Sequence, residues 1–365
     1  MKLIHLVVCV IFLSQAILRS QELDPQDIFI ANTHGITQFR IPALITTNSG
    51  TLIAVCDARV DREGDPPNNV DQVLRRSFDN GNTWESLVTI LDFPNKEGAG
   101  DPQLIQDPQT NRIFLFYGYC PGRNELINAP IMLGRHLSLQ YIFSDDEGIS
   151  WSLPIMVEYG LKKDGWHSLW PCPGRGTVLS DGTLVVPISG YDTKEIFSHL
   201  VFSKDHGETW QISGRIGVGI NEATLVELSD GTLLVNARND TKKRAIITSG
   251  DHGESWSEIS YHPQLVEPTC QGSFIKTQHK NQDILLFSNP DDSQKRQKMT
   301  IKVSFDNGQT WPVKKLIYSG PSAYSCLTAL ADGNIGILYE NGEKDPYDKI
   351  SFVSLDLDWL TEVSD

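Results

Sequence analysis

The sequence predicts an all-β fold, a six-bladed β-propeller. Two observations lead to this prediction. A short pattern recurs five times, and the sequence contains β-rich runs bounded by Asp-Gly turns but no long segment with the periodicity of a helix. The pattern is S-x-D-x-G-x-[ST]-W, and its copies begin at Ser77, Ser144, Ser203, Ser249 and Ser304. Successive copies lie 46 to 67 residues apart. This spacing fits four short strands with their turns better than a helical repeat of about 34 residues.

Each copy is expected to form a hairpin turn, which we call a repeated turn. Its Asp would accept backbone N–H groups, its Gly would adopt a positive φ, and its Trp would return into the sheet to be buried. Runs such as Thr183–Pro187 and Asn334–Tyr339 follow Asp-Gly turns and favour strands. Dividing about 340 residues by a unit of roughly 50 to 60 gives six blades. The repeated turns are therefore predicted to be structural.

Residues 1–20 predict a signal peptide, and residues 21–365 a single catalytic propeller domain. Lys2 precedes a mostly apolar run from Leu3 to Leu18, and small and polar residues follow at Ser20 and Gln21. The alternative is a retained membrane anchor, but the run is shorter than the roughly 20 residues needed to span a bilayer and contains polar side chains. We expect a secreted, extracellular protein, or a periplasmic one if the source is bacterial.

Charge and cysteine content restrict the partners. Acidic residues outnumber basic ones by 46 to 31, and the formal net charge of −15 argues against nucleic acid or an anionic membrane as the main partner. A local group of arginines can still bind a small anion. The five cysteines beyond the leader have no C-x-x-C pair, so they indicate buried packing or one or two disulfides rather than zinc. No metal or other cofactor is expected.

One tetrapeptide near the start of the predicted domain points to a family. Phe39-Arg40-Ile41-Pro42, together with the five repeated turns, resembles the exo-α-sialidases of the bacterial and trypanosomal type, and the likeness covers nearly all of residues 21–365. The resemblance implies a six-bladed propeller that releases terminal sialic acid from glycoproteins, glycolipids and oligosaccharides. Similar repeats occur in unrelated receptors and matrix proteins, so the functional prediction depends on individual site residues.

The substrate that the resemblance implies carries a carboxylate on its anomeric carbon, which must be bound. Similarity to the family assigns this role to three arginines, Arg40, Arg238 and Arg296. Planar guanidinium groups bind a carboxylate through two parallel hydrogen bonds. Arg296 lies in a polar stretch where Lys295 and Lys298 could be confused with it.

The resemblance also implies the reacting groups. Tyr324 matches the nucleophile of the family, and Glu222 matches its partner base. A phenol with a pKa near 10 is neutral, so it approaches the carboxylate-bearing carbon without charge repulsion, and the glutamate takes its proton. This tyrosine is an exception among retaining glycosidases. Asp65 matches the general acid, with Asp61 as the alternative, because the spacing in this loop varies across the family.

Further residues match substrate-binding positions. By the same resemblance, Arg59 would contact a ring hydroxyl, Asp101 would recognise polar substituents, and Glu340 would orient the first arginine. Trp166 and Trp170 flank a histidine and either stack on the leaving sugar or anchor a loop.

The sequence favours hydrolysis with retention of configuration. A trans-sialidase, or an intramolecular sialidase that forms an anhydro product, would use the same residues. A different class, a sialic acid-binding lectin with little turnover, would keep the arginines, but intact Tyr324, Glu222 and Asp65 argue against it.

Overall fold

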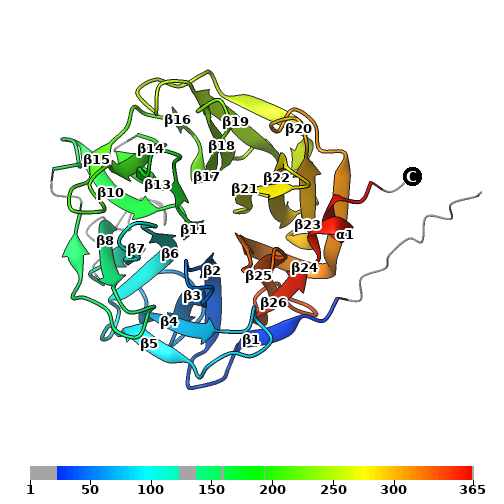
Figure 1. Cartoon of the computed structure of the whole chain (residues 1–365). Helices are drawn as coiled ribbons and strands as arrows, with labels where there is room; N and C mark the ends of the chain where they lie inside the picture. Colours follow the sequence, from blue (N-terminus) through cyan, green and yellow to red (C-terminus); the bar gives the residue numbers. More distant parts are fainter. Residues whose placement is uncertain (1–22, 123–136, 158–159, 193, 364–365) are drawn as a thin grey trace, which may run out of the picture.

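The structure is a computed structural model that describes residues 23–122, 137–157, 160–192 and 194–363. The predicted leader over residues 1–20 lies outside this part of the chain. Within it, nearly all regular structure is β, with one short helix, α1 (Leu357–Thr361), near the C-terminus (Figure 1). The all-β prediction is confirmed. No helix in the described ranges is both long and apolar enough to cross a membrane.

The strands form four hydrogen-bonded sheets around a common centre, with β2, β17 and β21 close to it (Figure 1). The nine-stranded sheet contains β2 (Gln38–Thr46), β3 (Leu52–Arg59), β4 (Val70–Ser77), β5 (Val88–Leu91), β6 (Gly98–Gln106), β7 (Ile113–Cys120), β8 (Ser138–Ser144), β9 (Ile155–Met156) and β11 (Gly174–Arg175). The six-stranded sheet contains β10 (Trp166–Pro171), β12 (Thr177–Val178), β13 (Leu184–Asp192), β14 (Ile196–Ser203), β15 (Gln211–Ile212) and β16 (Gly217–Val218).

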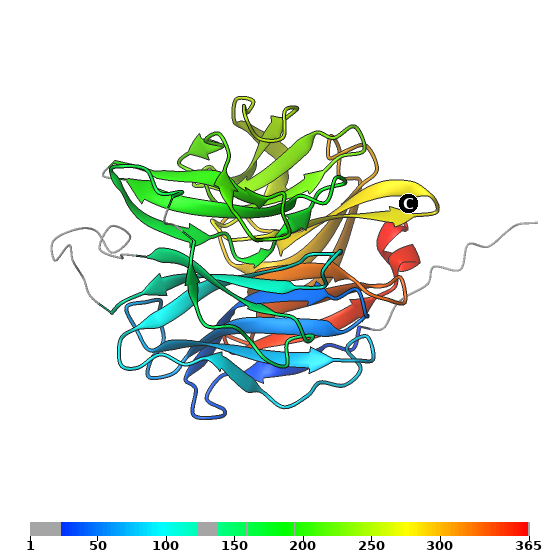
Figure 2. The ribbon, with the colours of Figure 1, turned by 60° about the vertical axis from the view of Figure 1, so that its left-hand side comes forward.

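The other two sheets complete the circle, and Figure 2 shows α1 on its outer side. The four-stranded sheet contains β17 (Asn221–Glu227), β18 (Leu233–Arg238), β19 (Lys243–Ser249) and β20 (Ser260–Val266). The seven-stranded sheet contains β21 (Ser273–His279), β22 (Gln282–Pro290), β23 (Gln297–Ser304), β24 (Val313–Ala329), β25 (Ile335–Asn341), β26 (Lys349–Leu355) and β1 (Gln26–Ile30).

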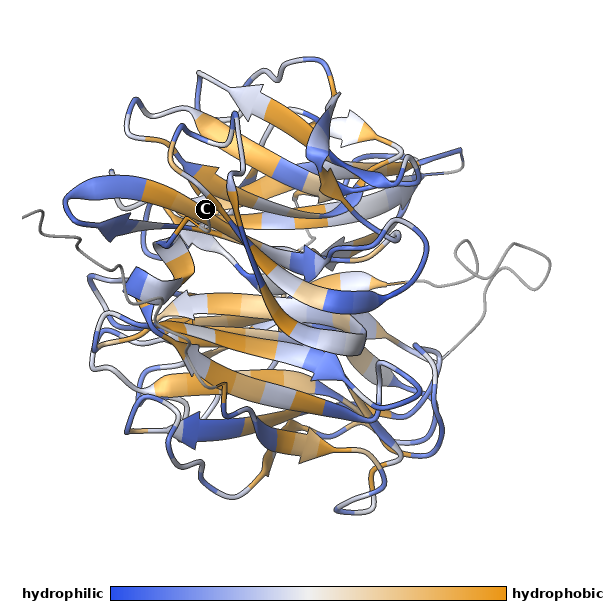
Figure 3. Cartoon of the chain, turned by 90° about the vertical axis from the view of Figure 1, so that its right-hand side faces the viewer, coloured by the Kyte–Doolittle hydropathy of each residue, from blue (hydrophilic) through white to orange (hydrophobic). Residues whose placement is uncertain are grey.

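The core lies between and within the sheets. Central strands such as β3 and β25 are buried along their whole length, because one face packs against a neighbouring sheet and the other against strands farther along the same curled sheet. Outer strands such as β20 are mostly exposed. Figure 3 shows apolar residues along the strands and hydrophilic residues in many connecting loops. All five cysteines of the described residues are buried, and Cys56, Cys172, Cys270 and Cys326 are free thiols.

The first and last strands of the described chain pair with each other. β1 runs antiparallel to β26, with Gln26 opposite Phe352 and Ile30 opposite Lys349. The carboxylate of Asp27 reinforces the pairing, since it accepts a hydrogen bond from Ser351 Oγ at 2.6 Å. One sheet therefore contains both ends of the described chain.

The repeated turns follow β4, β8, β14, β19 and β23 with the same hydrogen bonds each time. In the fourth copy, Ser249 Oγ donates to Asp251 Oδ1 at 2.7 Å and accepts the N–H of Gly253 at 2.8 Å. Asp251 Oδ1 also accepts the N–H of Ser255 at 2.9 Å, and Gly253 has a φ of 89°. The predicted turn is confirmed. The tryptophans are only partly buried, except for Trp311, because they cover the edges of the clusters rather than their centres.

Asp251→Ala is expected to lower the melting temperature by a few degrees and to leave kcat/KM of the folded protein nearly unchanged. The change removes the acceptor that holds the turn, and this turn belongs to the outer ends of β19 and β20. Thermal unfolding and steady-state kinetics measure the two effects. A loss of activity without a loss of stability would contradict the structural interpretation of the repeated turns.

Candidate active site

A cavity of about 200 Å³ is lined by residues from all four sheets. Its walls contain three arginines and several carboxylates beside a few apolar groups. The lining residues are Arg40, Ile41, Asp57, Asp65, Pro66, Gly100, Asp101, Gly118, Leu137, Trp170, Asn221, Glu222, Arg238, Arg296 and Tyr324. The strands thus bring most of the predicted site residues, which are far apart in sequence, to one place.

The inner strands lose their regular pairing register at this cavity. The irregularities lie at Arg40/Ala43 in β2, Gly100/Gln103 in β6, Asn221/Thr224 in β17 and Ser322/Ser325 in β24. A bulge of this kind turns a side chain away from the regular alternation of a strand. Ile41, Asp101 and Glu222 have φ values of 62°, 61° and 42°, which are unfavourable for residues with a Cβ. Three of the cavity-lining residues therefore have a strained backbone.

The three predicted arginines all line the cavity. Arg238 stands at the end of β18, and Arg296 directly precedes β23. Tyr347 connects Arg40 with Arg296. Its ring centroid lies 3.8 Å from Cζ of Arg40, and its hydroxyl accepts a hydrogen bond from Nη1 of Arg296 at 2.8 Å. Of the candidates in the polar stretch, the structure places Arg296 in the lining, whereas Lys298 pairs with Asp292.

Glu340 is fully buried behind the cavity and holds Arg40. Its Oε1 accepts hydrogen bonds from Nε of Arg40 at 2.6 Å and from the backbone N–H of Ile41 at 2.8 Å. Its Oε2 accepts the backbone N–H of Tyr324 at 2.9 Å. Glu340 thus occupies the position predicted for it and also fixes the backbone at Tyr324.

Tyr324 and Glu222 form a short hydrogen bond. The hydroxyl of Tyr324 lies 2.5 Å from Glu222 Oε1, and Nη1 of Arg238 donates to both groups, at 2.9 and 2.6 Å. Tyr324 is only 5% exposed. Burial, followed by the negative charge of Glu222, raises the pKa of Tyr324 well above its usual value, although Arg238 and Arg296 partly oppose this. The phenol is therefore neutral at physiological pH and has a carboxylate in place to accept its proton.

Asp65 lines the cavity with its side chain 44% exposed. Arg59 donates to the carboxylate of Asp65 from behind. Because Arg59 is only 2% exposed, it is not among the lining residues. Asp61 is exposed and is likewise absent from the lining among the residues described. The geometry thus favours Asp65 over Asp61.

Asp101 and Trp170 also line the cavity. The two predicted tryptophans therefore differ, because Trp166 packs against Phe197 in the core, with ring centroids 4.4 Å apart. Trp170 has access to a ligand and Trp166 does not.

Sequence reasoning missed two residues of this site. Tyr347 lies in a polar loop without any recognisable pattern. Asp57 stands two residues before Arg59 on β3 and faces the cavity, where Gln72 Nε2 donates to its Oδ1 at 2.8 Å. Burial raises the pKa of Asp57 to about 7; Asp65 adds to this, while Arg59 and the hydrogen bond from Gln72 act in the opposite direction. The sequence did contain a signal for Asp57: it stands two residues before Arg59 on the same strand, so both side chains lie on one face of that strand.

The chain is similar to several known proteins. Residues 43–337 match the BNR repeat-like domain family. A sialidase of Bacteroides fragilis is 35% identical, with 83% of this chain and 60% of the relative covered, and a sialidase of Micromonospora viridifaciens is 33% identical, with 92% and 54% covered. The solved structure of Hadza microbial sialidase Hz136 is 34% identical and has a TM-score of 0.84. The match covers 92% of this chain and 69% of that structure. The chain thus spans 54 to 60% of the length of the two curated relatives.

Proposed function

Because the chain belongs to the sialidase family, we propose that it is an exo-α-sialidase that hydrolyses terminal sialic acid from glycoconjugates with retention of configuration. One observation supports this most strongly: three arginines share a cavity with a tyrosine that is hydrogen-bonded to a glutamate. The arginines suit an anionic sugar, and the neutral tyrosine suits attack on a carbon that bears a carboxylate.

The substrate carboxylate would bind between Arg40, Arg238 and Arg296. Arg238 bonds to Glu222 and Tyr324, and part of this contact could be exchanged for one with the substrate. Arg40 is already held by Glu340 and needs little rearrangement. The carboxylates of Glu222 and Glu340 thus offset the charge repulsion between the arginines of the cavity.

In the first chemical step, the oxygen of Tyr324 would attack the anomeric carbon while its proton moves to Glu222. The glycosidic carbon–oxygen bond breaks, and Asp65 protonates the departing alcohol. In the second step, Asp65 removes a proton from water, the water oxygen attacks the anomeric carbon, the bond between this carbon and the Tyr324 oxygen breaks, and Glu222 returns its proton to the tyrosine. Two displacements give net retention.

Arg59 and Asp101 are proposed to contact the substituents of the sugar ring. Asp101 lines the cavity and can reach a ligand directly. Arg59 donates to Asp65, so its first effect would be to hold the acid in position, and a contact with a ring hydroxyl would need its guanidinium to reach past Asp65.

Asp65→Ala is expected to lower kcat/KM for sialyllactose about 10²- to 10⁴-fold more than for an aryl sialoside, because a phenolic leaving group departs without protonation. Measuring kcat/KM isolates the first chemical step. Asp61→Ala is the matched control from the same loop and should have little effect on either substrate. Equal losses on both substrates would assign Asp65 to binding or folding instead.

We also infer that the strands form six blades, each with a path of four paired strands, while β11, β12 and β16 lie outside these paths. The halves of the nine-stranded sheet meet at a single parallel pair, Val70 with Gly98. β24 is 17 residues long and pairs with β23 through its first part and with β25 through its second. Dividing the sheets at these points leaves six sets, and each repeated turn follows the third strand of a set. An experimental structure tests the division.

Secretion is part of the proposal and depends on residues 1–20. Sequencing the N-terminus of protein collected outside the producing cells tests it, and an N-terminus close to Gln21 is expected. A protein that retains Met1 would contradict cleavage.

The proposed reaction is tested by incubating the protein with sialyllactose and identifying the released sugar. Free sialic acid is expected. An anhydro sugar, or transfer to lactose, would replace hydrolysis by one of the related reactions. Tight binding without any released sugar would indicate a lectin. The test needs no assumption about linkage if both linkage isomers are supplied.

A further inference from the structure

A buried ion pair lies behind the cavity. Arg244 in β19 and Glu267, which follows β20, are both 0% exposed, and neither lines the cavity. Nη1 of Arg244 lies 3.5 Å from Oε2 of Glu267. Two apolar side chains of similar volume often stabilise a core as well as a buried pair does, because burial removes the charges from water. Stability alone therefore does not account for this pair.

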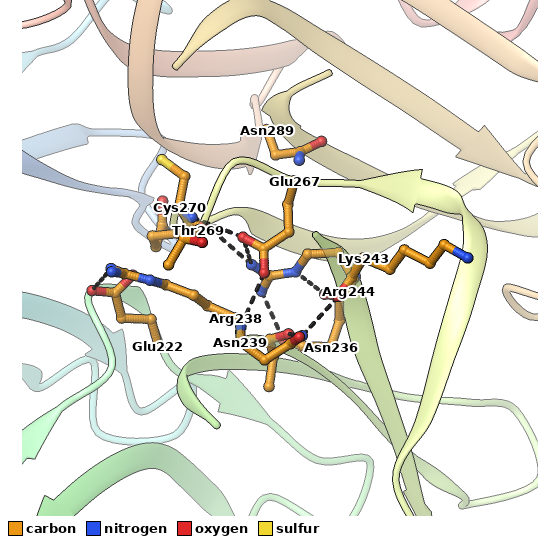
Figure 4. A network of polar contacts seen from close by, with 12 residues as sticks. Glu222, Asn236, Arg238, Asn239, Lys243, Arg244, Glu267, Thr269, Cys270 and Asn289 are labelled. Carbon is orange, nitrogen blue, oxygen red and sulfur yellow. Dashed lines mark hydrogen bonds and ion pairs between the residues drawn. The ribbon is translucent and has the colours of Figure 1, made fainter. Parts of the chain in front are cut away.

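Glu267 connects two backbone segments. Its Oε1 accepts the N–H of Asn239 at 2.9 Å, and its Oε2 accepts the N–H of Cys270 at 2.7 Å (Figure 4). Asn239 directly follows Arg238 in the chain. One carboxylate thus holds the segment that carries Arg238 against a segment near residue 270.

Arg244 makes the matching contacts from the other side. Its Nη1 donates to the carbonyl of Cys270 at 2.8 Å, and its Nη2 donates to the carbonyl of Asn236 at 3.2 Å. Asn236 stands two residues before Arg238 on β18, and its side chain also accepts from Nε of Arg244 (Figure 4). The segment near residue 270 contacts the site as well, since the carbonyl of Thr269 accepts a hydrogen bond from Nη2 of Arg296 at 2.8 Å.

We propose that Arg244 and Glu267 are positioning residues that set the distance and angle between Arg238 and Arg296. The inference rests on the proposed function, in which these two arginines bind the substrate carboxylate. Bidentate binding depends on the orientation of planar groups. The third arginine, Arg40, has its ion pair with Glu340, and its link to Arg296 runs through the Tyr347 ring and hydroxyl. The pair should therefore act on two arginines and not on the third.

Glu267→Gln is expected to lower kcat/KM for sialyllactose about 10- to 100-fold, in keeping with the cost of a displacement near 1 Å. The NH₂ group of a glutamine cannot accept a hydrogen bond. One of the two backbone N–H groups, that of Asn239 or that of Cys270, therefore loses its acceptor. Glu227→Gln is the matched control. Glu227 is buried, accepts the N–H of Ser180 at 2.6 Å and lies at the other end of β17 from Glu222, so its replacement should reduce stability and leave kcat/KM nearly unchanged.

Double-mutant cycles separate positioning from a general structural role. Glu267→Gln is combined with Arg238→Lys and, separately, with Arg40→Lys. Positioning predicts that the loss caused by Glu267→Gln shrinks at least several-fold when Arg238 is already replaced and stays the same when Arg40 is replaced. Equal losses in both backgrounds would overturn the proposal.

A second variant guards against failure to fold. Arg244→Met combined with Glu267→Leu leaves no unpaired buried charge, so it should lose less stability than removal of either partner alone, although the backbone groups bonded by the pair lose their partners. Its kcat/KM should still fall about 10- to 100-fold, because the backbone N–H groups of Asn239 and Cys270 lose the side-chain oxygens that accept from them. Wild-type kinetics in this variant would overturn the proposal.

Calorimetric titration with free sialic acid provides a readout that needs no turnover. If the wild-type protein binds sialic acid but hydrolyses nothing, the proposed function fails, and the same cycles measured on Kd still decide the role of Arg244 and Glu267. If it neither binds nor hydrolyses, both proposals fall.

Discussion

Tyr324→Phe is expected to lower kcat/KM for an aryl sialoside about 10⁴-fold or more, the scale of loss when one member of a nucleophile unit is removed. The phenylalanine ring keeps its packing beside Ile41 and Ala323, so the fold should persist. The variant loses the oxygen that would bond to the anomeric carbon. In the wild-type protein, a fluorinated sialic acid that slows the second step should add its mass to the peptide containing Tyr324.

Tyr117→Phe is the matched control. Tyr117 is also a buried tyrosine, and its hydroxyl donates to Gln140 Oε1 at 2.9 Å, away from the cavity. This change removes one hydrogen bond and should reduce stability while kcat/KM stays near the wild-type value. Near-normal turnover by Tyr324→Phe would exclude a nucleophilic tyrosine, and labelling confined to Glu222 would reverse the roles of the two groups.

Arg238→Ala and Arg40→Ala should each cost about 2 to 5 kcal/mol of transition-state stabilisation, seen as a fall in kcat/KM, which is the usual cost of truncating one partner of a buried charge pair. Arg238→Ala has a second effect, because Glu222 and Tyr324 lose a common hydrogen-bond donor. Steady-state kinetics on sialyllactose and calorimetry with free sialic acid measure the loss.

Lysine variants and a surface arginine serve as controls for these changes. Arg238→Lys keeps the charge but not the planar pair of donors, so it should recover only part of the loss. Arg112 pairs with Asp145 at the surface, and Arg112→Ala should change kcat/KM little. Near-normal kcat/KM in either Arg238→Ala or Arg40→Ala would contradict the carboxylate-binding role.

The sequence predicted the local parts of the fold well. The contacts of the repeated turns lie within a few residues, so the pattern contains them completely, as Ser249 and Asp251 show. Pairing between distant segments left no such pattern. The shared strand β24 and the pairing of β1 with β26 both depend on contacts across the whole chain, which strand propensity does not encode.

The site divides in the same way. Residues with a family pattern, such as Arg40 and Tyr324, could be named from the sequence. Tyr347 and Glu267 could not, because each acts on residues from other segments and lies in no motif. The bond between Arg40 and Glu340 spans 300 residues, so only a resemblance predicted it. Strain at Ile41 was also hidden, since isoleucine normally avoids positive φ.

The pairing of β1 with β26 affects how the protein is made. Asp27 and Ser351 are 324 residues apart, and at about 5 to 20 residues per second a ribosome needs roughly 16 to 65 s to produce the second after the first. During this time β1 has no partner strand and presents an open edge. Arg40 likewise waits for Glu340, which is synthesised only shortly before β26. A growing chain therefore carries an incomplete site until the segment from Glu340 to the end of β26 has been synthesised.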